Sequence, residues 1–257
     1  KVRADIIRLL SLKKPLVKVF SAQRNNLKYS MRRRSVNPMA EVLEMIRQSR
    51  GASLIYTRTR RSVEEWAENL QKAGIPAIPY HAGLDPEKRR KAMNCFLERE
   101  RPVLVATVAF GMGVDRSDVG LVLHLDLPST PEGYLQQSGR AGRDGLPANC
   151  TILFSSLDRK RIGWAIKSSC GRESQDVPLE EKSLNLVNIA QEQLRRMEAI
   201  AEGETCLEQA LLLAVGELTV PCNRCDRCEK PVSSKDWSCQ AKDLLAAVPE
   251  KKGIDVN

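Results

Sequence analysis

The sequence predicts an α/β fold with a mainly parallel sheet, followed by a smaller helical module. From residue 17 to residue 155, short apolar runs alternate with longer amphipathic runs. That alternation is the pattern of βαβ units. After Phe154, three helical runs follow without an intervening strand and lead into a turn dense in cysteine. The alternation and the point where it stops therefore define two parts of the chain.

Each element of the first part corresponds to one of these runs. Strands are expected at residues 17–20, 53–57, 77–80, 103–107, 121–126 and 150–154. Helices are expected between them at residues 39–48, 61–74 and 85–98. The last helix has the clearest start, because Asp85 can cap it and Pro86 suits its first position. In this architecture the loops at the carboxyl ends of the strands carry the chemistry.

The second part is predicted to be helical at residues 155–169, 179–202 and 206–217. The turn PCNRCDRCEKP, residues 221–231, comes next, and a last amphipathic stretch covers residues 239–248. The chain begins in what reads as the tail of a helix and lacks an initiator Met. We therefore expect a fragment of a longer protein.

Composition narrows the class of partner. The chain has 41 Lys and Arg against 32 Asp and Glu, a formal charge of +9, which favours a polyanion such as nucleic acid. A basic domain without such a partner is the alternative. No apolar run of about 18 residues and no signal peptide occur, so we expect an intracellular protein without a membrane partner. The eight cysteines then indicate metal ligation rather than disulfides.

The stretch QQSGRAGRDG, residues 136–145, places Arg140 and Arg143 on a glycine-rich loop. Gly139 and Gly142 allow the backbone to come close to a ligand, and guanidinium forks match phosphate oxygens. Arginines that reach a transferring γ-phosphoryl group act as arginine fingers. A solvated basic turn is the alternative interpretation.

The residues that would bind the nucleotide itself are missing. The sequence has no G-x-x-x-x-G-K-[ST] loop, and neither His81 nor His124 lies in an Asp-Glu-x-His run. His124 stands within an apolar strand and is predicted to be a hydrogen-bonded core residue. An arginine pair here therefore needs a phosphate that is supplied from elsewhere.

Four cysteines have the spacing of a structural metal site. Cys222, Cys225 and Cys228 follow C-x₂-C-x₂-C, and Cys206 lies sixteen positions before the first of them. Four thiolates suffice for a closed tetrahedral zinc site, while an iron–sulfur cluster is the alternative. The remaining cysteines are expected to be small buried residues, although Cys239 is close enough in sequence to compete as a ligand: Cys95, Cys150, Cys170 and Cys239.

Three stretches resemble motifs of the RecQ family of superfamily 2 DNA helicases. YLQQSGRAGRDGLPA is similar to motif VI, VLVATVAFGMGVDRSDV to motif V, and LIYTRTRRSVEEWAENLQKAGIPAIPYHAGLDPEKRRKAMNCF to motif IV with its YHAGL segment. The cysteine cluster resembles the zinc module of the same family. The resemblance implies the tail of a first lobe and a linker at 1–16, a RecA-like second lobe at 17–155, a zinc-binding subdomain at 156–235, and the start of a truncated C-terminal region at 236–257.

The resemblance also implies a role for each matching residue. Arg143 would be the arginine finger, Arg140 would steady the γ-phosphate, and Gln136 would couple the nucleotide to the lobe. The glycines of motif V and its aspartate would shape the loop between the ATP cleft and the DNA: Gly111, Gly113 and Asp115. Four residues would face a DNA strand: Thr59, Arg60, His81 and Thr107.

A member of this family would bind Zn²⁺ here and hold ATP and Mg²⁺ mainly in its first lobe, and this fragment alone is expected to be inactive. The resemblance further implies ATP-driven 3′–5′ translocation on single-stranded DNA and unwinding of forks or junctions in DNA repair and recombination. The first lobe of the same protein would be a partner, and the location would be the nucleoid or nucleus. A non-catalytic, zinc-stabilised nucleic-acid-binding module is the alternative. An RNA helicase lobe is disfavoured by the cysteine cluster and by VAFGMGVD.

Two stretches depart from the family pattern. After Cys206 the family usually has an arginine, and here Leu207 follows; near the end of the same helix Ala214 and Val215 replace an aromatic pair. The linker stretch SAQRNNL has neither the usual aromatic residue nor the usual proline. We therefore expect the hinge into the second lobe to pack differently.

Overall fold

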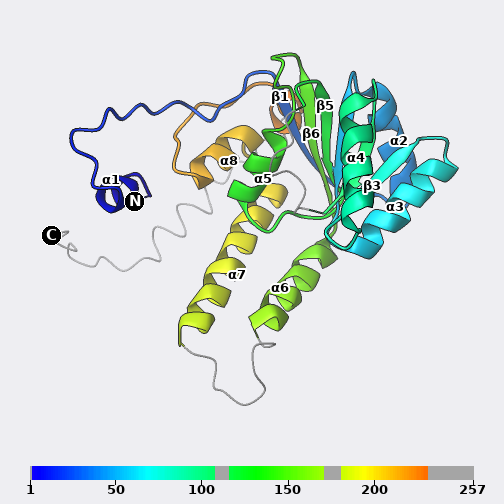
Figure 1. Ribbon diagram of the computed structural model, residues 1–257. Helices are drawn as coiled ribbons and strands as arrows, with labels where there is room; N and C mark the ends of the chain where they lie inside the picture. The colour runs from blue at the N-terminus through cyan, green and yellow to red at the C-terminus, as the bar shows by residue number, and fades with distance from the viewer. Residues whose placement is uncertain (1, 108–115, 171–180, 231–257) are drawn as a thin grey trace, which may run out of the picture.

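The structure is a computed structural model that describes residues 2–107, 116–170 and 181–230 (Figure 1). Its strands are β1 (Leu27–Arg33), β2 (Ala52–Tyr56), β3 (Ala77–Tyr80), β4 (Val103–Ala106), β5 (Val119–His124) and β6 (Ala148–Phe154). Its helices are α1 (Val2–Leu9), α2 (Pro38–Gln48), α3 (Arg60–Lys72), α4 (Pro86–Glu98), α5 (Pro131–Ser138), α6 (Ser156–Cys170), α7 (Glu181–Glu202), α8 (Leu207–Ala214) and α9 (Asp226–Glu229). None of the helices within these ranges is long and apolar enough to cross a membrane.

The six strands form one parallel sheet in the order β1-β6-β5-β2-β4-β3. On one face, α2 and α3 contribute Val42, Val63 and Leu70 to a buried aliphatic layer. On the other face, Phe96 of α4 and Tyr134 of α5 are fully buried. Two covered faces explain the continuous apolar runs in β2, β4 and β5, since such strands have no solvent side. The predicted RecA-like α/β fold class is confirmed.

The predicted strand at residues 17–20 is wrong. These residues form neither helix nor strand, and Val17, Val19 and Phe20 are exposed. The first strand is instead β1, in which Leu27, Tyr29 and Met31 alternate toward the core. The short run VKVF had the composition of a strand but no neighbour to pair with. The period-2 alternation in LKYSM was the signal that identified the real one.

The sequence analysis also missed α5, which leads into the arginine pair. Thr130 caps this helix by accepting a hydrogen bond from the backbone N–H of Gly133 at 2.9 Å, and Pro131 occupies its first turn. Asp85 and Pro86 begin α4 in the same way, with Asp85 accepting from the N–H of Lys88. The N-terminal signature was therefore present in the sequence at both helices.

The helical part packs onto the sheet rather than standing apart from it. Leu194 and Met197 of α7 and Leu207 and Leu211 of α8 belong to the same buried cluster as the strands. The short helix α9 also covers the free edge of β1, where the carboxylate of Asp226, its first residue, accepts from the backbone N–H of Met31 at 3.0 Å. An uncovered edge strand would be a template for aggregation.

Candidate nucleotide and metal sites

The turn that carries the arginine pair is fixed at its glycine. Gly142 has φ of +55°, and a Cβ there would lie 2.4 Å from Nδ2 of Asn26 and 2.8 Å from the carbonyl oxygen of Leu146. Its N–H donates to the carbonyl of Val119 at the start of β5, at 2.9 Å. Only glycine combines this backbone conformation with so close an approach. The turn therefore passes the amino ends of β5 and β6.

The linker before β1 holds the same turn from the other side. Arg24 Nη2 and Asn26 Nδ2 both donate to the carbonyl oxygen of Gly142, at 2.7 and 2.8 Å. Asn26 Nδ2 also lies 2.9 Å from the carbonyl of Leu146. A charged donor to a carbonyl is a strong contact. The segment between Gly139 and Leu146 is thus pre-organised by residues more than a hundred positions away.

A third clamp acts through Arg50. Its Nη2 lies 2.8 Å from the carboxylate of Asp144, and its Nε donates to the carbonyl of Pro147 at 2.9 Å. Asp144 is the residue that follows Arg143 directly. Arg143 is exposed, and the backbone around it is fastened on both sides.

Arg140 is half-buried and lies beside Tyr56, the last residue of β2. Burial raises the pKa of Tyr56 to about 12, and the hydrogen bond and positive charge of Arg140 act in the opposite direction. The Nε of Arg140 is buried and has no hydrogen-bond partner within the described part of the chain. Because an unsatisfied buried donor is costly, this nitrogen fits an anion that completes the site.

Tyr56 belongs to a buried polar cluster around His124. The two rings stack with centroids 4.9 Å apart, and Tyr134 meets His124 edge-on at 5.1 Å. His124 Nε2 lies 2.6 Å from Oε1 of Gln137 on α5. The prediction that His124 is a hydrogen-bonded core residue is confirmed. The cluster joins the ends of β2 and β5 to the helix that precedes Arg140.

This histidine makes stability depend on pH. Burial lowers the pKa of His124 from 6.5 to about 4, so the unfolded chain binds a proton between these values and the folded chain does not. The free energy of unfolding should therefore fall on acidification from pH 6.5 to 4, by up to about 3 kcal/mol from this residue. Urea unfolding of wild type and His124→Asn across this range measures the effect. The free energy of unfolding of the variant should depend less steeply on pH than that of wild type. An equal dependence in the two proteins would contradict the contribution of His124.

The four predicted DNA-facing residues follow three neighbouring strands at their carboxyl ends. Thr59 ends the loop after β2, His81 follows β3, and Thr107 follows β4, with its N–H 3.3 Å from the carbonyl of Tyr80. Arg60 lies over the loop after β3, because its side chain contacts the position that a Cβ on Gly83 would fill. The structure therefore brings these four residues to one edge of the sheet.

Two of them also have local structural roles. The side chain of Thr59 caps α3 by accepting from the N–H of Ser62 at 3.0 Å. His81 is only 4% exposed; its Nε2 lies 3.2 Å from Glu64 and its Nδ1 accepts from the N–H of Gly83. These contacts are enough to explain a threonine and a histidine at these positions, even if neither side chain contacts DNA. Contact with a DNA strand stays a prediction for all four positions.

Of the other residues predicted for the nucleotide site, Gln136 lies within the described part of the chain and three lie outside it. Gln136 is exposed on α5, next to the Gln137 that contacts His124. Gly111, Gly113 and Asp115 lie outside the described residues. Arg116, just after them, caps the end of α4: it donates to the carbonyl of Leu97 at 3.1 Å and pairs with Asp118 at 2.6 Å.

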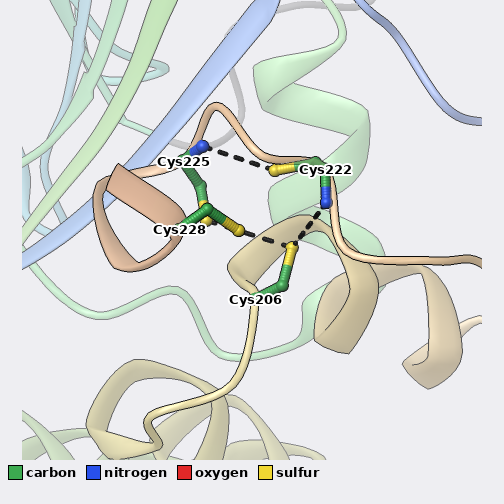
Figure 2. Close-up of side chains that lie close together, drawn as sticks. All are labelled: Cys206, Cys222, Cys225 and Cys228. Carbon is green, nitrogen blue, oxygen red and sulfur yellow. Dashed lines mark hydrogen bonds between the residues drawn. The ribbon is translucent and has the colours of Figure 1, made fainter. Parts of the chain in front are cut away.

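The four predicted metal ligands come together as the spacing indicates (Figure 2). The sulfur atoms of Cys206, Cys222, Cys225 and Cys228 all lie within 4.8 Å of one another, and those of Cys206 and Cys225 are 3.9 Å apart. A tetrahedron with Zn–S bonds of about 2.3 Å needs sulfurs about 3.8 Å apart. The cluster therefore fits a zinc ion with a small contraction.

Backbone donors surround this sulfur cluster. The N–H of Cys222 lies 3.2 Å from the sulfur of Cys206, and the N–H of Gln209 lies 3.5 Å from it. Burial raises the pKa of the Cys206 thiol, but these donors outweigh it and the net shift is downward. The N–H of Cys225 approaches the sulfur of Cys222 at 3.3 Å and lowers the pKa of that thiol, although burial, the larger effect, keeps it raised. Donors aimed at sulfur favour thiolates, which are the form that binds metal.

Arg224, between the second and third of the clustered cysteines, ties the metal turn to the linker. Its guanidinium pairs with the buried carboxylate of Glu208 and donates to the carbonyls of Leu27 and Arg24 at 3.1 and 3.2 Å. Arg24 in turn holds Gly142. A chain of hydrogen bonds therefore connects the cysteine cluster with the arginine turn. Sequence reasoning missed Arg24, Asn26 and Arg224, because only the fold brings them to their partners.

Most of the parallel sheet and the arginine turn lie in a segment that is similar to a known helicase domain. The model of the helicase conserved C-terminal domain matches residues 36–145. The ATP-dependent DNA helicase RecQ of Pasteurella multocida is 34% identical over 96% of this chain, and that of Bacillus subtilis is 31% identical over 98%. The ATP-dependent DNA helicase Q-like 2 of Arabidopsis thaliana is 34% identical over 99%.

The chain is similar to RecQ helicases along nearly all of its own length. It spans 37% of the length of the Pasteurella relative, 41% of the Bacillus relative and 35% of the Arabidopsis relative. The resemblance of its motifs to this family is thereby confirmed.

Proposed function

We propose that this chain is the second motor lobe and zinc module of an ATP-dependent 3′–5′ DNA helicase. The observation that carries the proposal is the clamped arginine turn. Arg24, Asn26 and Arg50 hold its backbone, while a buried nitrogen of Arg140 has no hydrogen-bond partner in the described part of the chain. A non-catalytic nucleic-acid-binding module would have no use for guanidinium groups held in this way.

The arginine pair would act on a nucleotide that another lobe holds. In the intact protein, the first lobe would bind ATP and Mg²⁺, and closure of the two lobes would bring Arg140 and Arg143 to the γ-phosphate. Arg143 would stabilise charge that develops on the transferring phosphoryl group. Arg140 would steady the phosphate, Gln136 would relay its presence to the lobe, and Gly113 and Asp115 would shape the loop between ATP and DNA.

The DNA strand would lie along the carboxyl edge of β2, β3 and β4. Thr59, Arg60 and Thr107 offer hydroxyl and guanidinium groups there, which suit phosphate oxygens. His81 supports the same edge by holding Gly83. Opening and closing of the lobes during ATP hydrolysis would move this edge along the strand and force a duplex apart. Such an activity belongs to DNA repair and recombination, in the nucleoid or nucleus.

The four cysteines would hold Zn²⁺, which supplies folding energy rather than chemistry. Their turn carries Asp226 on the edge of β1 and Arg224 on the linker. The metal module would therefore support the sheet and the arginine turn together.

Strand displacement by the full-length protein tests the proposed function. The substrates are partial duplexes with a single-stranded tail at either the 3′ or the 5′ end of the loading strand. We expect ATP-dependent displacement from the 3′-tailed substrate only. Displacement from the 5′-tailed substrate alone would contradict the polarity, and ATP-independent binding without displacement would favour the non-catalytic module.

A further inference from the structure

The hairpin of α6 and α7 carries an exposed tryptophan in a basic groove. Trp164 on α6 is 69% exposed. It lines a groove of about 540 Å³ between α6 and α7. Other apolar residues of these helices are also exposed, among them Leu157 and Leu186. What distinguishes Trp164 is the groove that it lines and the cations beside it.

Cationic side chains outnumber the acidic one around the indole. Lys160, Trp164 and Lys167 are spaced by four and three positions on α6, so they share one face of that helix. Arg195 of α7 lines the same groove, whose ten lining residues include four cationic side chains and one carboxylate, Glu198. That carboxylate pairs with Arg159 at 2.9 Å, and Arg195 pairs with Glu192 at 3.6 Å. The two lysines leave the groove with a net positive charge, which attracts an anionic backbone.

The groove is open at its glycine. Gly163 lines it, and apart from the neighbouring residues of its own helix a Cβ at this glycine would meet no described atom within 4 Å. An aromatic platform flanked by cations is the general arrangement by which proteins bind single-stranded nucleic acid, since every base has a face that can stack.

We propose that the groove between α6 and α7 binds a segment of single-stranded DNA, with an unpaired base stacked on Trp164 and the backbone beside Lys160 and Lys167. The inference rests on the proposed function, because it takes the DNA strand of that function as its ligand. It adds a contact on the helical module, separate from the carboxyl edge of the sheet. Duplex DNA offers no free base face and is expected to bind this groove less well.

Fluorescence anisotropy of labelled oligo(dT) with the full-length protein tests the proposal. Trp164→Ala should weaken binding about tenfold, while Trp164→Tyr, which keeps a stacking ring, should stay close to wild type. Leu157→Ala is the matched control, because Leu157 is an exposed apolar residue of the same helix that does not line the groove. Lys160→Ala and Lys167→Ala should each lower the salt dependence of binding.

The test separates failure of this inference from failure of the proposed function. The Leu157→Ala control should hydrolyse ATP at the wild-type rate at saturating DNA, because this residue does not line the groove. Wild-type affinity in a folded Trp164→Ala variant would overturn the stacking proposal and leave the motor intact. Absence of DNA-stimulated hydrolysis in the wild type would instead overturn the proposed function.

Discussion

Replacement of Cys225 by serine is expected to unfold the metal module and to abolish zinc binding. Cys225 is fully buried between the other sulfurs, and a structural zinc site contributes an apparent binding free energy of about 10–16 kcal/mol at pH 7. That exceeds the whole stability of most domains. Elemental analysis of the purified protein should find one zinc per chain in wild type and none in Cys225→Ser.

The loss of structure in Cys225→Ser should extend beyond the cysteine cluster. Without the metal turn, Asp226 no longer covers β1 and Arg224 no longer holds the linker. Amide hydrogen exchange should therefore rise in α8, in β1 and in the arginine turn. Cys95→Ser is the matched control, since this cysteine lies on α4 outside the cluster and its loss should leave the zinc content unchanged. Iron in place of zinc, or full protection of α8 without metal, would refute the structural role.

The sheet could be predicted where local signals were strong. β2, β4 and β5 are continuous apolar runs, because helices cover both faces of the sheet. β1 was missed for a physical reason: it lies at the edge of the sheet, polar residues interrupt its apolar ones, and the exposed Arg32 and Arg33 end it. The exposed run at residues 17–20 was wrongly predicted to be a strand, because apolar composition alone does not show whether a neighbouring strand exists.

The candidate site also has one part that could be predicted from the sequence and one part that could not. The cysteines could be predicted from spacing, because three of the four ligands come from one turn. The residues that hold the arginine turn could not be predicted. Arg24 reaches Gly142 across 118 positions, and Arg224 reaches Arg24 across 200. No local pattern encodes such contacts, since they exist only once the sheet has formed.

The second large effect concerns Arg143. In the full-length protein, Arg143→Ala should lower the rate of DNA-stimulated ATP hydrolysis by about 10³- to 10⁵-fold, because it removes the fork that stabilises the transferring phosphoryl group. Arg143→Lys should have a rate of ATP hydrolysis only slightly above that of Arg143→Ala, since an ammonium group cannot make the same paired hydrogen bonds. The side chain is exposed, so neither change should disturb the fold.

Arg90→Ala is the matched control for this substitution. Arg90 is an exposed arginine on α4, away from the arginine turn, and its loss removes the same charge from the protein. Zinc content and the affinity for oligo(dT) should be unchanged in both variants. A shared fall in activity would point to net charge rather than to the position of Arg143.

The most direct measurement is kcat for ATP hydrolysis at saturating DNA and ATP, in full-length wild type, Arg143→Ala and Arg90→Ala. If Arg143 completes a nucleotide site whose other half lies in the first lobe, kcat falls by orders of magnitude in Arg143→Ala alone, with DNA binding retained. A kcat for Arg143→Ala equal to that of wild type would contradict the central claim.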